Sequence, residues 1–146
     1  MKKLLLNLSI AATTALVFTA CTGNNTPTPQ SAAKVDEKAL CSVEKNGIEK
    51  VLATAKLYNE AAKQNKLEFR RLEVNNSDLI IAVEEGIKSG AKEVNPKTFK
   101  GKKSKTVLPI EFAATRACKF GIAALSQAYE AKTTWRAAVP GDGFKY

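Results

Sequence analysis

The sequence predicts a small all-α protein, a bundle of three to five helices with one disulfide bond. Apolar residues recur at three- and four-residue spacing through two long segments, and alanines are frequent in the second of them. Only Leu67–Val74 favours a strand, and it has no evident partner strand. We therefore expect that segment to be an extended connector or a helical continuation.

Two helices are predicted in the first half of the domain. A stripe of apolar residues from Val35 to Val43 precedes Asn46-Gly47, which is typical of a helix C-terminus. A second stripe runs from Ile48 to Ala62 and predicts a helix of about 17 residues. One longer helix interrupted at Gly47 is the alternative.

Two further helices are predicted in the second half. Ser77 is a candidate N-cap for a short buried helix that ends near Gly90. Pro109 suits the first turn of a long helix that reaches Ala138, before Pro140. In this helix, Gly121 marks either a close helix crossing or a kink.

The N-terminal 20 residues have the pattern of a signal peptide. Lys2 and Lys3 supply positive charge, and Leu4–Ala20 is uncharged and mostly apolar. The run ends in Phe18-Thr19-Ala20-Cys21, where the sequence resembles a bacterial lipoprotein precursor. The resemblance implies that Cys21 carries diacylglycerol and fatty acid (palmitate) after cleavage. Thr22, rather than aspartate, follows the cysteine, and by the same resemblance this favours the outer membrane. The alternative is a plain secreted protein with Cys21 as a free thiol.

The lipoprotein resemblance defines the expected domain organisation. Residues 1–20 are the signal peptide, 21–34 a lipidated flexible tether, 35–139 the helical domain, and 140–146 a C-terminal tail. The segment 22–33 is uncharged, with two prolines and small polar residues, so we expect a linker. An ordered loop packed on the domain is the alternative. Loss of Lys2 and Lys3 lowers the formal net charge from +9 to +7.

Two cysteines remain if Cys21 is lipidated. Cys41 and Cys118 form an even pair in an oxidising compartment, which favours a structural disulfide between the first and last helices. Two buried free thiols, or a reactive catalytic thiol, are the alternatives.

The strongest charge feature is the segment 96–106, which we expect to be an exposed basic loop. Five lysines fall within nine residues without an acidic residue among them: Lys97, Lys100, Lys102, Lys103 and Lys105. Such a loop attracts anions, which in the cell envelope are anionic lipid, lipopolysaccharide or peptidoglycan. Nucleic acid is not an expected partner of an exported protein. A merely solvated lysine loop is the simplest alternative.

Catalytic chemistry has little support in the sequence. Without histidine, the base of Ser-His and Cys-His sites and the commonest zinc ligand are lacking. The adjacent acids Asp36-Glu37 and Glu84-Glu85 are expected to be exposed helix charges. Trp135 is expected in the core, and Phe144 and Tyr146 either dock on the bundle or form a free recognition peptide.

These observations predict a non-enzymatic, lipid-anchored cell-envelope protein with a helical binding or scaffold domain, an unknown protein partner, and no cofactor or metal. The alternatives are an anion-binding adaptor for membrane or cell wall that uses the lysine loop, and an envelope inhibitor or immunity protein.

Overall fold

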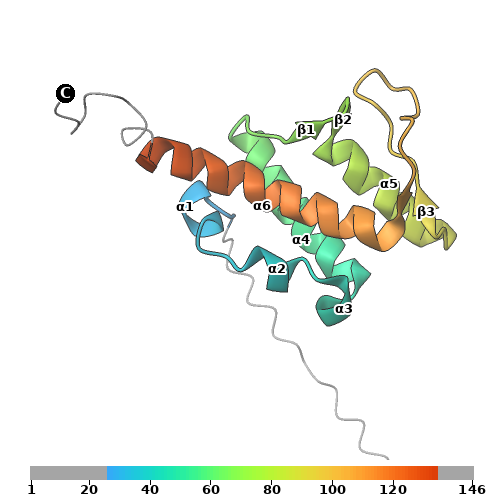
Figure 1. Cartoon of the computed structure of the whole chain (residues 1–146), viewed down its shortest axis with the longest axis horizontal. Coiled ribbons are helices and arrows are strands. Elements are labelled where there is room, and N and C mark those ends of the chain that lie inside the picture. The colour runs from blue at the N-terminus through green and yellow to red at the C-terminus, as the bar shows by residue number, and fades with distance from the viewer. Residues whose placement is uncertain (1–25, 135–146) are drawn as a thin grey trace, which may run out of the picture.

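A computed structural model describes residues 26–134, which form a mostly helical domain (Figure 1). The predicted signal peptide, Cys21, Trp135 and the C-terminal tail lie outside these residues. The described elements, in order, are α1 (Pro29–Ala32), α2 (Glu37–Leu40), α3 (Val43–Asn46), α4 (Ile48–Gln64), β1 (Arg70–Arg71), β2 (Val74–Asn75), α5 (Asn76–Ser89), β3 (Glu93–Val94), β4 (Leu108–Pro109) and α6 (Ile110–Thr134).

The predicted all-α class is confirmed, with additions. Helices α4, α5 and α6 pack on one another and contribute most of the core, while α1, α2 and α3 are single turns. The described part thus holds six helices rather than three to five. Two minimal antiparallel sheets, β1–β2 and β3–β4, flank α5.

The three long helices follow their sequence signals closely. Helix α4 has the expected 17 residues, and Gly47 separates it from α3. Gly90 ends α5 in the left-handed conformation, with φ of +67°. Pro109 directly precedes the first residue of α6, so the expected start is off by one position.

The expected first helix is two separate turns. The side chain of Asp36 caps α2 by accepting from the backbone N–H of Ala39, and Ser42 caps α3 in the same way through Lys45. Each capping residue begins a new helical turn, because the Asp36 carboxylate or the Ser42 hydroxyl accepts from a backbone N–H that would be paired within the helix if the helix were continuous.

The prediction of a flexible tether across 21–34 is wrong for residues 26–34. Pro27 and Ala32 are buried, and α1 packs against α6. Thr28 and Ser31 form a capping box around Pro29, a local helix start that the linker-like composition concealed. This part of the chain corresponds to the alternative, an ordered segment packed on the domain.

The prediction for Leu67–Val74 is also wrong. Arg70 pairs with Asn75 and Arg71 with Val74, so the segment supplies its own partner strand by turning back at Leu72-Glu73. Both turn residues have positive φ, +47° and +66°. Such a turn normally takes Asn or Gly, which explains why the sequence did not signal it.

Gly121 marks a close helix crossing. A Cβ at this position would lie 3.1 Å from the backbone nitrogen of Asn59 and 3.1 Å from the Cβ of Tyr58, both on α4. The missing side chain therefore lets α6 approach the α4 backbone directly.

The predicted disulfide is present. Cys41 and Cys118 are bonded, with a Cα–Cα distance of 5.7 Å, and both are fully buried. The bond links the end of α2 to the middle of α6.

Candidate functional site

The predicted basic loop connects β3 to β4 and is ordered by its own backbone. Lys97 and Lys103 form an antiparallel bridge, and the N–H of Thr98 donates to the carbonyl of Lys102 at 2.7 Å. The N–H of Ser104 donates to the carbonyl of Pro96 at 3.0 Å. Because the backbone groups pair with one another, the loop is a folded hairpin-like structure whose five lysines are exposed.

A small polar interior holds this loop in place. The amide of Asn95 donates to the carbonyls of Ser104 and Thr106, at 2.9 and 3.1 Å. Pro96 is fully buried, and Thr98 and Ser104 are 9% exposed. The polar composition of the segment predicted full exposure, and this prediction is wrong for Pro96, Thr98 and Ser104.

The β1–β2 hairpin lies against the loop (Figure 1). The N–H of Phe99 donates to the carbonyl of Glu73 at 2.8 Å. The guanidinium of Arg70 lies 5.0 Å from the centre of the Phe99 ring, within the range of a cation–π contact. The contact with Phe99 places Arg70 beside the lysines of the loop, and Arg71 lines a cavity together with Pro96 and Thr106 of the loop.

Helix α6 contributes one further cation, Arg116. Together with Arg71, it lines a cavity of about 30 Å³ under the hairpin, and its guanidinium lies 5.1 Å from the Phe120 ring. Burial, followed by repulsion from Arg71, lowers the pKa of Arg116. Two guanidinium groups therefore line the same cavity.

We call this assembly the basic face. It consists of Arg70, Arg71, Lys97, Lys100, Lys102, Lys103, Lys105 and Arg116. Residues 95–108 contain no acidic residue, and the hairpin contains one, Glu73. The ion pairs found within residues 26–134 involve other residues, on α2, α4, α5 and α6. The positive charge of the basic face is thus concentrated and largely uncompensated within the described domain.

Sequence reasoning found the five lysines but missed the three arginines. Arg70 and Arg71 precede the loop by about 25 residues, and Arg116 follows it on another helix. The adjacent arginines of the LEFRRLEV segment were a local signal of charge, but not of where that charge lies.

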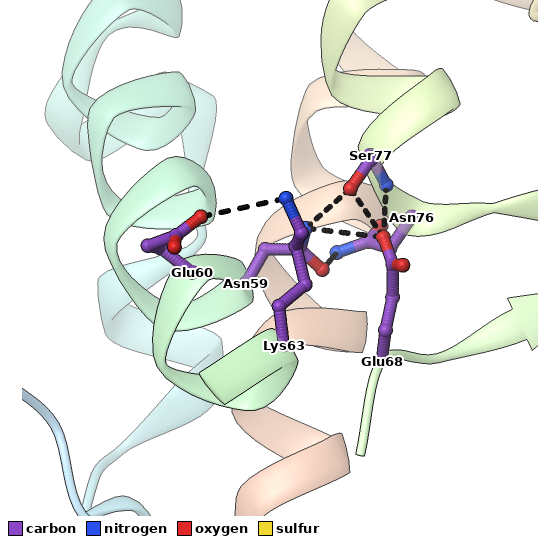
Figure 2. Close-up of polar contacts among 6 residues, drawn as sticks. All are labelled: Asn59, Glu60, Lys63, Glu68, Asn76 and Ser77. Atoms are coloured by element: carbon purple, nitrogen blue, oxygen red, sulfur yellow. Dashed lines mark hydrogen bonds and ion pairs between the residues drawn. The ribbon is translucent and has the colours of Figure 1, made fainter. Parts of the chain in front are cut away.

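A second polar cluster lies between α4 and α5 (Figure 2). The side chain of Asn76, 1% exposed, donates to Oδ1 of Asn59 and to the carbonyl of Ala117, both at 3.0 Å. Asn59 in turn donates to the hydroxyl of Ser77 at 3.0 Å. This polar network (Asn59 and Asn76, which are buried, with Glu68 and Ser77, which are half-buried) links α4, α5 and α6.

Glu68 gives the network its charge and caps α5. Its Oε1 accepts from the backbone N–H of Ser77 at 2.9 Å and from the Ser77 hydroxyl. The expectation that Ser77 is the N-cap is therefore wrong, because α5 begins at Asn76 and a carboxylate from outside the helix satisfies the orphan donor. Burial raises the pKa of Glu68, but the hydrogen bonds from Ser77 and Asn59 and the charge of Lys63 outweigh it and lower the pKa below its ordinary value.

Replacing Glu68 with glutamine tests this cap. We expect Glu68→Gln to lower the free energy of unfolding at neutral pH by about 1 kcal/mol, since the helix N-terminus loses a charged acceptor. The folded-state pKa is lowered, so the stabilisation is complete above the unfolded pKa and is lost as the pH falls through the folded value.

Urea unfolding at a series of pH values measures the effect. The parent and the variant should converge in acid, because Glu68 is then neutral in both the folded and the unfolded parent. A constant difference between them at all pH values would assign the effect to packing rather than to charge.

The adjacent acids of the sequence have local structural roles. Glu84 pairs with Lys56 at 2.7 Å and with Lys88 at 3.1 Å, and these lysines lower its pKa. Asp36 caps α2, and Glu37 lies 3.8 Å from Lys119 on α6.

Comparisons with other proteins add no relative: no family model, no curated protein and no solved structure matches the chain. Within residues 26–134, none of the helices is both long and apolar enough to cross a bilayer. The same residues contain no cluster of three potential metal-ligating side chains. The fold and the site define a small disulfide-linked helical domain with an ordered basic face.

Proposed function

We propose that this protein is a membrane-anchored cell-envelope lipoprotein whose helical domain is a non-catalytic binding module. The basic face is its binding surface, and the partner is anionic. The observation that carries the proposal is the convergence of eight cations from the hairpin, the loop and α6 beside a single acidic residue of the hairpin.

The order of the loop supports binding rather than simple solvation. A surface that is already folded loses less conformational entropy when a ligand binds it than a flexible lysine segment does. Hydrogen bonds from Asn95 and contact with the hairpin already fix this loop. A bound anion would also relieve the repulsion between Arg71 and Arg116.

Binding to a soluble polyanion tests the basic face. The chain from residue 22 onward, without lipid, retains the described core, which extends from Ala32 to Leu125. We expect it to bind inorganic polyphosphate with an affinity that falls as salt rises, because binding releases counterions from the polymer. The loop variant carries glutamine at Lys100, Lys102, Lys103 and Lys105.

A control variant distinguishes an effect of the loop lysines from an effect of the protein's overall net charge. It carries glutamine at four exposed lysines around α2, α3 and the start of α4: Lys34, Lys38, Lys45 and Lys50. We expect the loop variant to bind polyphosphate roughly tenfold more weakly, or worse, and the control to stay close to the parent. Equal losses in both would show that only overall charge matters and would contradict the proposed site.

The anchor has its own test. We expect Cys21→Ser to abolish acylation and to release the protein from membranes, since stable anchoring requires more than one acyl chain. Intact mass spectrometry of the membrane-extracted parent should show a mature chain that begins at acylated Cys21. An unmodified Cys21 in that chain would exclude the anchor.

A further inference from the structure

Exposed apolar side chains gather around the basic face. Six large apolar side chains are strongly exposed in the described domain, and four of them belong to the hairpin, the loop or the first turn of α6: Leu72, Phe99, Val107 and Phe112. A binding surface for a purely hydrophilic polyanion does not require such side chains.

Leu72 occupies the tip of the hairpin at a conformational cost. Its φ is +47°, in the left-handed region that leucine rarely adopts, and its side chain is 70% exposed. Asn or Gly would form the same turn with less strain. Within the described domain, the leucine gains little burial in return.

Phe99 lies beside this tip because the loop is hydrogen-bonded to the hairpin turn. Its N–H bonds to Glu73, the residue after Leu72, and its ring is 45% exposed. Arg70 and Lys100 approach the ring to 5.0 and 5.6 Å. Two exposed apolar groups therefore lie among cations.

Leu72 and the lysines also share one concave surface. An open hollow of about 510 Å³ is lined by the hairpin tip and by the loop. Its lining includes Leu72, Lys100, Lys102, Lys103 and Lys105. The apolar tip and the positive charges can therefore meet the same partner at the same time.

We propose that the basic face docks on an anionic lipid bilayer, with Leu72 and Phe99 entering the headgroup region while the cations contact lipid phosphates. This inference rests on the proposed function and specifies its partner. A soluble polyanion neutralises the cations but leaves both apolar groups in water. An anionic bilayer accommodates both, since apolar burial and electrostatic attraction act together at its surface.

Vesicle binding by the unlipidated chain tests this inference. We expect the chain to co-sediment with vesicles that contain phosphatidylglycerol and to bind poorly to phosphatidylcholine alone. The tip variant is Leu72→Asn with Phe99→Ser; asparagine tolerates positive φ, so the turn is preserved. The control replaces two exposed apolar residues of α4 and α5, Leu57→Ser and Ile81→Ser.

The inference predicts a specific pattern. Relative to the parent, the tip variant should lose roughly tenfold or more in vesicle affinity, while the control should change little. The tip variant should lose far less polyphosphate affinity than the loop variant, because it retains every cation of the basic face and loses only the contacts of Arg70 and Lys100 with the Phe99 ring.

A fluorescence measurement gives a second test that does not depend on affinity. The indole of a Leu72→Trp variant should be quenched by brominated lipid, whereas that of a Leu57→Trp variant should not. Quenching in each variant is compared with quenching in the parent, because Trp135 contributes the same background fluorescence to all three proteins.

The two proposals fail in different ways. If the parent binds polyphosphate and vesicles but the tip variant binds vesicles equally well, the face recognises anionic charge alone, and the bilayer inference is overturned. If the parent binds neither, the proposed function itself is overturned.

Discussion

Loss of the Cys41–Cys118 bond is expected to lower the free energy of unfolding by about 4 kcal/mol, according to the chain-entropy model for a loop of this length. The bond closes a loop with a sequence separation of 77, which contains α4, α5 and both small sheets. Without it, the unfolded chain gains much conformational freedom. Since a small domain is stable by only about 5–15 kcal/mol in total, this one bond is a large share.

Denaturant unfolding of the parent with and without reductant measures this effect. The matched variant is Cys41→Ala with Cys118→Ala, which removes the bond without leaving free thiols. We expect the variant to unfold at much lower denaturant concentration than the oxidised parent and to be insensitive to reductant. If the oxidised and reduced parent had similar free energies of unfolding, the expected stabilisation by the disulfide would be contradicted.

Gly121→Val is expected to lower the free energy of unfolding by about 3 kcal/mol, because overpacking forces backbone or rotamer shifts. A Cβ alone would approach the Asn59 nitrogen and the Tyr58 Cβ to 3.1 Å, and valine adds two further methyl groups. Backbone atoms of α4 cannot rotate away as a side chain can. The substitution should therefore push α4 and α6 apart.

Thermal and urea unfolding of two further α6 variants provide the controls. Ala131→Val places the same β-branched residue at an exposed position of the helix, so it reports the loss of helix propensity alone. Gly121→Ala should be far milder than Gly121→Val, since its gain in helix propensity offsets the tight contact. A Gly121→Val variant as stable as Ala131→Val would show that the crossing is not close.

The basic face was only partly predictable from sequence. Its five lysines are neighbours in the chain, so their number and sign were readable directly. The contributions of Arg70 and Arg116 depend on the hairpin and α6 meeting the loop, and those contacts are long-range. The aromatic partner of Arg70, Phe99, belongs to the loop, but nothing local indicates that the two will meet.

The sequence by itself determined the features that arise from short-range chemistry. The apolar periodicity of α4, the left-handed glycine that ends α5 and the proline before α6 all depend on neighbouring residues. The bond between Cys41 and Cys118 was also predicted from the sequence, by setting Cys21 aside as the expected lipidation site, and the predicted bond is present.

Only the tertiary structure decided the rest. The turn at Leu72-Glu73 uses residues with poor turn propensity, so its strain is balanced by contacts elsewhere, including the hydrogen bond from Phe99 to Glu73. Helix α1 is a single turn, which is too short to be stable alone, and it is held by burial of Ala32 against the core. In the turn, a local preference of the chain is overridden by contacts with segments distant in sequence, whereas in α1 a weak local helix signal becomes stable only by packing on the core.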